Sequence, residues 1–292
     1  MPDPQHRGVR TAQLGLLVNT VLAGIKLVAG ILGSSGALIA DAIESIADIF
    51  SSIVVWGGLR IAAREADEEY PFGYGKAEPL AAAVVGLMLV AAATGVAIEA
   101  VREIHTPHQT PAPFTLAVLV VVILIKEVLF RRVLAVSGEM ASQAMRADAW
   151  HHRSDAITST AAFIGIGIAI WKGPGWESAD DWAALVAAVV IAANGFSIVR
   201  PAVHDLMDRA PDAAMLLRIA RAASSVEDVL AIEKLKVRRA GVGVYVDVHV
   251  QANPSLSLHD AHIVSGRVKG AIRGAAPEVL GVLVHMEPFE QF

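Results

Sequence analysis

The chain has 292 residues, of which 54% are hydrophobic, and its formal net charge at pH 7 is −5. A net negative charge argues against a general nucleic-acid-binding protein, because such proteins usually present a basic surface. The absence of cysteine excludes disulfide bonds and thiolate metal sites, so any transition metal bound by this chain must be held by imidazole and carboxylate groups.

Six apolar blocks follow one another from the N-terminus, and each is long enough to cross a bilayer as a helix, which takes about 20 residues. They cover residues 12–33, 36–60, 79–103, 113–135, 147–171 and 179–201. The residues before the first block lack a signal-peptide pattern, so we expect that block to be retained. The sequence predicts an α-helical membrane protein whose transmembrane domain, residues 1–209, is a six-helix bundle.

Positively charged residues gather on one side of this bundle. The chain ends and connections on that side carry Arg7, Arg10, Arg60, Arg64, Lys76, Arg131, Arg132, Arg146, Arg200 and Arg209. The opposite connections carry only Lys172, with Arg102 near one end. Because cytoplasmic loops carry an excess of lysine and arginine, we expect a multi-pass protein of the cell (inner) membrane with both termini in the cytoplasm.

Residues 210–292 have the composition of a soluble domain, which we expect on the cytoplasmic side. The pattern predicts, in order, a helix, two strands, a helix and a strand, at 212–224, 229–239, 242–252, 258–274 and 279–287. The second of these strands alternates strictly, so that Tyr245, Asp247 and His249 share one face and valines occupy the other. This α-β-β-α-β order indicates a small α+β domain with helices layered on one sheet.

Two of the apolar blocks carry ionisable residues at helical spacing. Such residues are costly inside a membrane and usually face a bundle interior, so each is a functional candidate. The second block carries Asp41, Glu44 and Asp48 on one face, and the fifth carries Asp148, His151 and Asp155 on one face. His152 and Arg153 point away from that face, and we expect them at the cytoplasmic rim.

The second and fifth blocks run in opposite directions in this topology, so as neighbours they bring Glu44 and Asp48 opposite His151 and Asp155. Packed together without a cation, the carboxylates would repel one another and take up protons. A set of imidazole and carboxylate ligands suits Zn²⁺ in tetrahedral geometry and is compatible with Fe²⁺, Mn²⁺, Co²⁺ or Cd²⁺. The histidine favours Zn²⁺ among these ions.

Other interpretations of these charges stay open. Asp41 and Asp148 could be helix-end charges that reach the membrane interface. His151 and Asp155 could form an intramembrane salt bridge to an arginine. The metal site is nevertheless the interpretation we follow, because two pairs at spacing i,i+4 occur on helices of opposite direction.

Several motifs resemble those of the cation diffusion facilitator family of metal/proton antiporters. They are "LIADAIESIADIFSS" in the second block, "YPFGYGKAEPLAA" entering the third, "ADAWHHRSDAITS" in the fifth and "LMDRAPD" after the sixth. The resemblance covers nearly the whole chain and implies a homodimer whose transport site is formed by Glu44, Asp48, His151 and Asp155. This chain departs from the family at Glu44, where members usually carry aspartate, histidine or asparagine.

The connection before the third block departs from the family as well. Some bacterial members hold an additional zinc site on histidines here, whereas this chain has Tyr70 and Tyr74, with Asp67 upstream. Phenol groups, whose pKa is about 10, are poor metal ligands near pH 7, so we expect no metal at this loop. The resemblance implies that Lys76 pairs with Asp208 to hold two protomers together. The alternative is that Lys76 only anchors the cytoplasmic side.

The resemblance also implies a regulatory metal site in the cytoplasmic domain, at a dimer interface. The matching residues are Asp247, His249, His285 and Glu287, with His262 on the second helix of that domain as a further candidate and Glu233 where some members have a histidine. His285 and Glu287 are two residues apart and therefore share one face of the last strand. The alternative is an exposed strand that carries histidines without binding a metal.

Together these features predict a secondary transporter that exports a divalent transition-metal cation in exchange for protons and has no prosthetic group. We expect alanine at Asp48 or Asp155 to abolish transport, and alanine at Asp180, in an outer loop, to leave it intact. An alternative is a non-transporting membrane metal sensor or scaffold whose cytoplasmic domain recruits partners. An intramembrane metalloenzyme would need a general base beside the metal, as in H-E-x-x-H. No such string occurs, so no enzyme is predicted.

Overall fold

A computed structural model describes residues 4–106, 109–139, 143–241 and 243–289, and their side chains except those of 4–12, 137–139, 143–148 and 151. The part up to residue 206 forms long helices. These are α1 (Pro4–Leu32), α2 (Gly36–Ala62), α3 (Ala77–His105), α4 (Phe114–Glu139), α5 (Gln143–Lys172) and α6 (Ser178–Leu206). Each contains nearly all of one predicted block and extends beyond it at one end or both, so the expected helical membrane domain is confirmed.

Within the described residues, four segments are long and apolar enough to cross a membrane: Gln13–Leu32, Ala77–His105, His152–Lys172 and Ser178–Leu206. They belong to α1, α3, α5 and α6. Helices α2 and α4 are of similar length but carry ionisable residues in their central turns. Polar residues inside membrane helices usually face a bundle interior, so we expect the ionisable residues of α2 and α4 to contact neighbouring helices.

The chain folds into two compact units. One comprises residues 1–54 and 84–199, and the other comprises residues 55–83 and 200–292. The last turns of α2, the first turns of α3 and the end of α6 therefore belong to the same unit as the C-terminal domain. The domain boundary expected near residue 209 was based on a change in amino-acid composition. The division between the two units does not coincide with it, because that division falls inside α2, α3 and α6.

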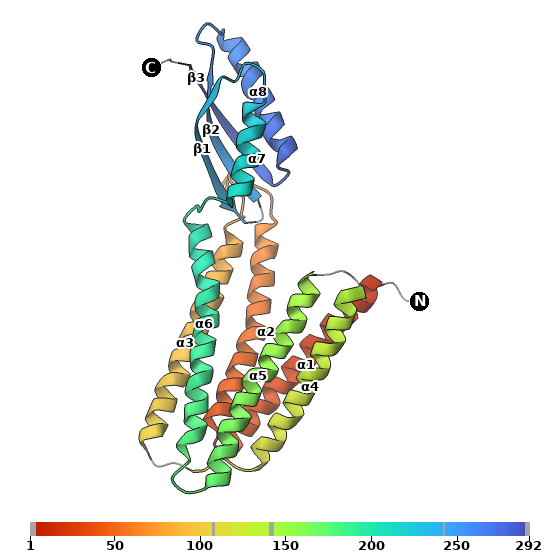
Figure 1. The fold of residues 1–292 in the computed structure, drawn as a ribbon, viewed down its shortest axis with the longest axis vertical. Coiled ribbons are helices and arrows are strands. Elements are labelled where there is room, and N and C mark those ends of the chain that lie inside the picture. The colour runs from red at the N-terminus through yellow and green to blue at the C-terminus, as the bar shows by residue number, and fades with distance from the viewer. Residues whose placement is uncertain (1–3, 107–108, 140–142, 242, 290–292) are drawn as a thin grey trace. The chain divides into compact units, whose positions relative to one another are not determined.

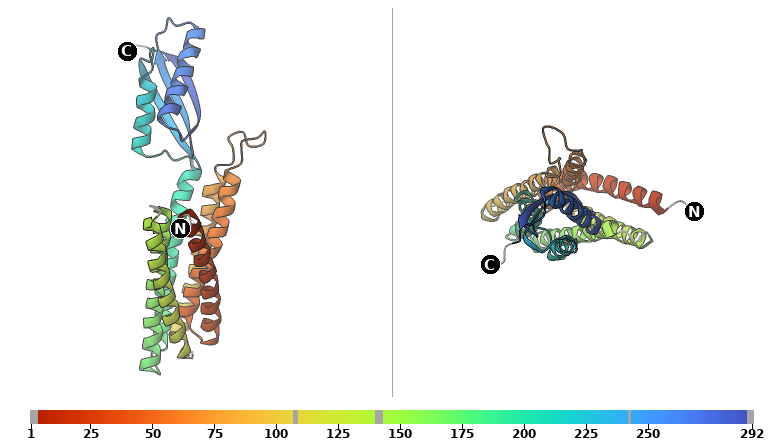
Figure 2. Two further views of the ribbon diagram at one scale, coloured as in Figure 1. Left: turned by 90° about the vertical axis from the view of Figure 1, so that its right-hand side faces the viewer. Right: turned by 90° about the horizontal axis from the view of Figure 1, so that it is seen from above.

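In the first unit, α4 packs along α5, and α1 packs against α4. The start of α1, the end of α4 and the start of α5 lie at the same end of the bundle (Figure 1 and Figure 2). Helices α3 and α6 approach each other closely at Gly86 and Gly195. A Cβ atom built on either glycine would lie 2.8 Å from the carbonyl oxygen of the other, so a side chain at either position would force the two helices apart.

The C-terminal domain contains α7 (Ala213–Ser224), β1 (Ala231–Ala240), β2 (Gly243–Ala252), α8 (Leu258–Ala275) and β3 (Val279–Pro288). Its described strands form a sheet in the order β1-β2-β3, with β1 antiparallel and β3 parallel to β2. The side-chain oxygens of Asp212 and Ser257 accept backbone N–H groups and begin the two helices. The predicted α+β domain is confirmed.

The alternation predicted for β2 determines which face of the sheet the helices cover. Val244, Val246, Val248 and Val250 are buried, together with apolar residues of α7 and α8, while the residues between them are half-exposed. Figure 1 shows both helices on one side of the strands. The opposite face, which carries Tyr245, Asp247 and His249, is therefore not covered by the two helices.

Candidate metal transport site

Helices α2 and α5 are antiparallel (Figure 1), and they meet where Ser159 contacts Asp41. The Ser159 hydroxyl lies 3.1 Å and 2.9 Å from the two carboxylate oxygens of Asp41, and the Asp41 residue is only 2% exposed. Because the helices run in opposite directions, residues that follow Asp41 lie level with residues that precede Ser159. This contact therefore sets the register between the two helices.

The register brings Glu44 to the level of Asp155, about one helical turn from the Asp41–Ser159 contact. Both residues are buried, with 8% and 6% of their surface exposed. The charges of Asp41, Asp48 and Asp155 all act on the Glu44 carboxyl group. Among the described residues, no group forms a hydrogen bond with Glu44 Oε2. The structure thus brings Glu44 and Asp155 together with the half-buried Asp48, and this crowding of carboxylates favours a bound cation or protons.

The fourth predicted ligand, His151, lies in α5 one turn before Asp155, but its side chain is outside the described residues. Its neighbour His152, expected at the cytoplasmic rim, is buried. It is 1% exposed and packs near α1, where a Cβ atom on Gly15 would lie 3.6 Å from its Nε2. Arg153 is exposed, and its guanidinium carbon lies 4.7 Å from the Phe130 ring centroid. That distance is an ordinary van der Waals contact, so the imidazole of His152 packs on α1 beside Gly15.

Two lysines of the described part are fully buried beside these carboxylates, and both were overlooked in the sequence. Lys126 of α4 lies 2.6 Å from Asp155 Oδ2, and Lys26 of α1 lies 2.9 Å from Asp41 Oδ2. Asp155 is therefore in an ion pair, as one alternative proposed, although with a lysine and not an arginine. Asp41 is buried and does not reach the interface. Lys26 and Lys126 interrupt the apolar runs "LAGIKLVAG" and "VILIKEVLF", a signal that could have revealed them.

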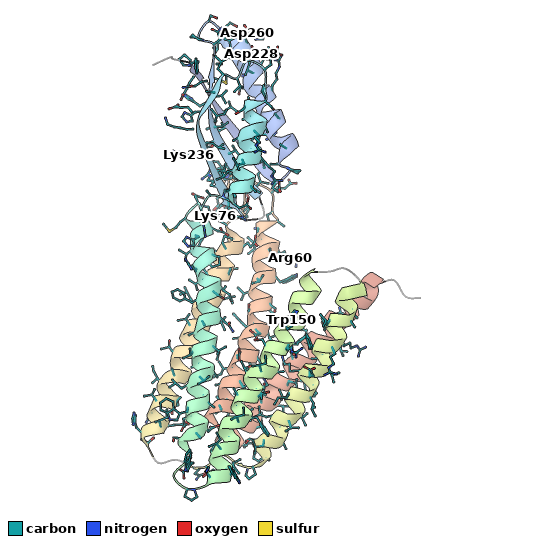
Figure 3. All side chains as sticks on the ribbon, viewed as in Figure 1. Arg60, Lys76, Trp150, Asp228, Lys236 and Asp260 are labelled. Carbon is teal, nitrogen blue, oxygen red and sulfur yellow. The ribbon has the colours of Figure 1, made fainter. Side chains whose placement is uncertain are left out.

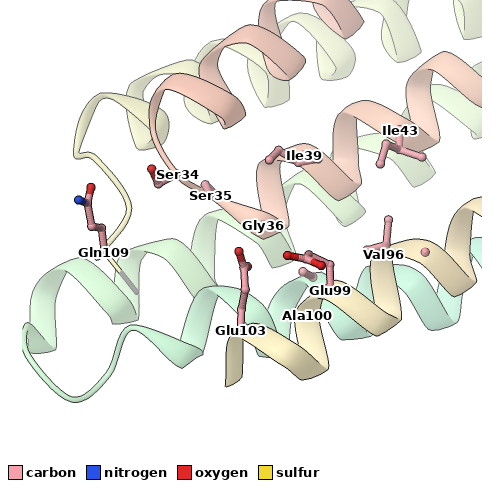
Figure 4. A pocket seen from close by; sticks show the side chains of 12 residues that line it. Ser34, Ser35, Gly36, Ile39, Ile43, Val96, Glu99, Ala100, Glu103 and Gln109 are labelled. Carbon is pink, nitrogen blue, oxygen red and sulfur yellow. The ribbon is translucent and has the colours of Figure 1, made fainter. Parts of the chain in front are cut away.

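A cavity of 410 Å³ lies beside the start of α2 and the end of α3. Figure 4 shows Glu99 and Glu103 of α3 beside the Ser35–Gly36 turn. The cavity wall continues along α2 to Ile43, the residue before Glu44. It therefore begins near the bundle end opposite the α4–α5 connection and reaches the level of the carboxylates.

Asp180 is not an exposed loop residue. It is 1% exposed and accepts hydrogen bonds from the Ser35 hydroxyl at 2.8 Å and from the backbone N–H groups of Gly36 and Ala37 at 2.6 Å and 3.4 Å. The first backbone N–H groups of a helix lack partners within the helix. The Asp180 carboxylate accepts hydrogen bonds from these N–H groups in α2, so the first turn of α6 caps the helix that carries Glu44 and Asp48.

In the C-terminal domain, three of the predicted ligands form a cluster on the open face of the sheet. His249 Nδ1 lies 2.6 Å and His285 Nε2 lies 3.4 Å from Glu287 Oε1. One ligand atom from each of the three residues lies within 4.8 Å of the others. The parallel pairing of β2 and β3 places His249 directly beside His285. Two imidazoles and a carboxylate are the ligand types that bind Zn²⁺ and other transition metals.

Two other candidates do not join this cluster. Asp247 shares the face, but its registered neighbours are Leu283 on β3 and Lys236 on β1, which are not metal ligands. His262 is exposed on α8, and α8 covers the valine face of the sheet. His262 therefore stands on the other side of the sheet from His249, a position that sequence order alone does not reveal.

The pair implied at the dimer interface forms within one chain. Lys76, immediately before α3 (Figure 3), lies 3.0 Å from Asp208 Oδ1, and both side chains are well exposed. Arg238 of β1 lies 3.7 Å from the other Asp208 oxygen. These contacts link α3, the end of α6 and the sheet inside the second unit. A role between protomers stays a prediction.

The tyrosines of the loop before α3 are engaged with Asp67. The Tyr74 hydroxyl donates to Asp67 Oδ2 at 2.7 Å, while Asp67 Oδ1 accepts the N–H groups of Glu69 and Tyr70. The hydrogen bond from Tyr74 lowers the pKa of Asp67, and the same bond raises the pKa of Tyr74. Tyr74 is therefore a neutral phenol near pH 7, a poor metal ligand, and the loop is closed by its own hydrogen bonds.

Comparison with known proteins agrees with this arrangement. The family model for the cation efflux transmembrane domain matches residues 12–207, and that for the cation efflux protein cytoplasmic domain matches residues 211–289. Over 284 residues the chain is 29% identical to the manganese efflux system protein MneP of Bacillus subtilis, covering 96% of each chain. It is 31% identical over 264 residues to the magnetosome protein MamB of Magnetospirillum gryphiswaldense, covering 90% of this chain and 88% of that one.

A plant relative matches at greater identity but is longer. The chain is 34% identical over 306 residues to metal tolerance protein C1 of Arabidopsis thaliana, a match that covers 99% of this chain and spans 64% of the length of that protein. The two family matches together cover almost all of the chain. The chain therefore belongs to the cation diffusion facilitator family, whose members are membrane transporters for the efflux of divalent metals and not enzymes.

Proposed function

We propose that this chain exports a divalent transition metal from the cytoplasm in exchange for protons, through a site formed by Glu44, Asp48, His151 and Asp155. The observation that supports the proposal is the Asp41–Ser159 contact, which aligns α2 with α5 and brings Glu44 to the level of Asp155. Lys26 and Lys126 offset part of the negative charge of these buried carboxylates, and the remainder favours a bound cation or protons. A divalent cation and protons compete for the same lone pairs, so binding of one expels the other.

Zn²⁺ is the substrate favoured by the imidazole of His151, and Mn²⁺ is the alternative. Three carboxylates make the site rich in oxygen, and oxygen ligands suit Mn²⁺. The relative MneP is described as a manganese efflux protein, which also supports Mn²⁺. Affinity alone does not decide which metal a site transports, because geometry and metal availability contribute.

The proposed cycle alternates access to the site between the two sides of the membrane. Substrate sites of such transporters lie near the midplane of the bilayer, as Glu44 and Asp155 do if α2 and α5 span it. The cavity lined by Glu99 and Glu103 would form part of the release path toward the outside. This assignment rests on the proposed orientation, in which both termini face the cytoplasm in the cell (inner) membrane.

The test is metal flux into proteoliposomes that hold the protein with its cytoplasmic side outward. We expect Zn²⁺ or Mn²⁺ uptake to accelerate when the lumen is acidic, and metal addition to make the lumen more alkaline. Uptake should also slow when the outer medium is acidified from about pH 8 to about pH 5.5, because protons then compete for His151. Metal uptake without proton movement would rule out exchange. Metal binding without uptake would favour a sensor or scaffold.

We also propose that His249, His285 and Glu287 bind a regulatory metal in the cytoplasmic domain of a homodimer. The full-length variant His249→Ala/His285→Ala should bind one metal ion fewer per chain in calorimetric titration. Acidification should weaken binding at this site, because only neutral imidazoles bind metals. A control variant, His259→Ala, changes an exposed residue at the start of α8 and should bind as the unaltered chain does. An equal stoichiometry in all three proteins would mean that the cluster binds no metal.

A further inference from the structure

Lys126 is a charged residue for which the proposed exchange cycle has no role. Its side chain is 2% exposed, near the middle of α4. The amino group lies 2.6 Å from Asp155 Oδ2 and 2.9 Å from Asn19 Oδ1 of α1. One ammonium group therefore links three helices, α1, α4 and α5, at a carboxylate that the proposed function assigns to the metal.

A lysine and a divalent cation at the same carboxylate oxygen exclude each other. Both are positively charged, and their repulsion is strong in a buried site because the effective dielectric constant there is low. A metal that binds Asp155 through Oδ2 must displace the ammonium group. A metal that binds through the other oxygen still lies close to a fixed positive charge. In both cases Lys126 opposes the binding of the metal.

We infer that Lys126 competes with the transported ion for Asp155 and thereby lowers the metal affinity of the site. The inference rests on the proposed function, because it requires Asp155 to be a metal ligand. A transporter must release its ion on the far side of the membrane, and a tethered cation that takes the place of the ion favours release. Lys126 is thus a positioning residue that acts on the metal through Asp155.

The Asn19 side-chain oxygen can keep its hydrogen bond with the Lys126 ammonium group when a metal displaces that group from Asp155. A buried charge without a hydrogen-bonding partner is very unfavourable, so displacement from Asp155 alone would be opposed strongly. The Asn19 side-chain oxygen already accepts from Lys126 and remains available when a metal occupies Asp155. The Asn19 oxygen therefore reduces the cost of exchanging the lysine for a metal.

The second buried lysine differs in this respect. Lys26 pairs with Asp41 and also donates to the Ser45 hydroxyl at 2.9 Å. Asp41 in turn accepts from Ser159 and is outside the proposed set of four ligands. The Lys26–Asp41 pair therefore holds α1, α2 and α5 together, whereas the Lys126–Asp155 pair involves the transport site itself.

The test is metal affinity in the full-length protein in lipid nanodiscs, measured by calorimetry with Zn²⁺ and with Mn²⁺. All variants carry His249→Ala/His285→Ala, so that the cytoplasmic cluster does not contribute. Lys126→Gln removes the competing charge, and we expect the Kd to fall about tenfold or more. Metal release in the flux assay should slow. Lys126→Arg keeps the charge and should stay near the parent value.

The matched control is Lys172→Gln, the same change at the exposed end of α5, which should leave the Kd unaltered. An equal or weaker affinity in folded Lys126→Gln would overturn the inference. If that variant does not fold, Asn19→Leu tests the same point with Lys126 in place. Loss of the Asn19 oxygen leaves the ammonium group dependent on Asp155, so metal binding should weaken severalfold, and an unchanged Kd would overturn the inference.

One further variant separates the inference from the proposed function. Asp155→Asn removes the shared carboxylate charge and should lose metal binding in the same background. If Asp155→Asn binds metal as tightly as its parent, the proposed transport site is wrong. If it loses binding while Lys126→Gln has the parent Kd, the transport site stands and only the role given to Lys126 is wrong.

Discussion

Replacing Asp155 by asparagine is expected to lower the initial rate of metal flux by at least about 100-fold. Loss of a residue that only supports a metal ligand costs up to about 100-fold, and loss of the ligand itself should cost more. The same change at Asp48 should have a comparable effect. Asp155 is buried beside Glu44, so a neutral amide removes a negative charge where a dication must be held. The measurement is uptake of Zn²⁺ and Mn²⁺ into proteoliposomes that contain equal amounts of folded protein.

Glu127→Gln is the matched control for both variants. Glu127 is the residue after Lys126 on α4, but its carboxylate pairs with the exposed Arg131 at 2.7 Å, on the same helix. The change also converts a carboxylate into an amide within the bundle, and we expect flux within about twofold of the unaltered chain, because exposed ion pairs contribute little. Normal flux in both Asp48→Asn and Asp155→Asn would eliminate the proposed site.

Replacing Asp180 by alanine is expected to destabilise the membrane domain by about 2–4 kcal/mol, the sum of a lost helix cap and buried donors left without acceptors. From the sequence, Asp180 was expected to lie in an outer loop, where its replacement by alanine would not affect transport. Its burial and its hydrogen bonds to Ser35, Gly36 and Ala37 argue against that expectation. The thermal unfolding midpoint in detergent should fall, and flux should fall with the fraction of folded protein.

Asp180→Asn retains one side-chain oxygen as an acceptor and should recover most of the lost stability. Glu177→Ala provides a control in the same connection, because the one described hydrogen bond of the Glu177 side chain is to the backbone N–H of the loop residue Gly175. Its effect should stay within about 0.5 kcal/mol. An unfolding midpoint in Asp180→Ala equal to that of the Glu177 control would show that the cap contributes nothing to stability.

Most of the element order was accessible from the sequence because it depends on local patterns. Apolar length predicted the membrane helices, and strict alternation in "VGVYVDVHVQA" predicted both β2 and the grouping of its valines on one face. Helical spacing also grouped Glu44 with Asp48, and strand spacing grouped His285 with Glu287. Each of these inferences needs only residues within one element, where the geometry repeats every 3.6 or 2 residues.

The contacts between elements were not accessible in the same way. Lys126 reaches Asp155 on α5, and Asp180 reaches the first turn of α2. His152 is buried beside Gly15 of α1. His262 is separated from His249 because α8 lies on the opposite face of the sheet. None of these pairings follows from spacing along the chain.

The sequence by itself therefore determined the class of protein and the acidic groups on which metal transport would depend. Only the tertiary structure decided which cations already accompany those groups, namely Lys26 beside Asp41 and Lys126 beside Asp155. The physical reason is that periodicity specifies the face on which a side chain lies, whereas a long side chain such as lysine finds its partner according to how separate helices pack.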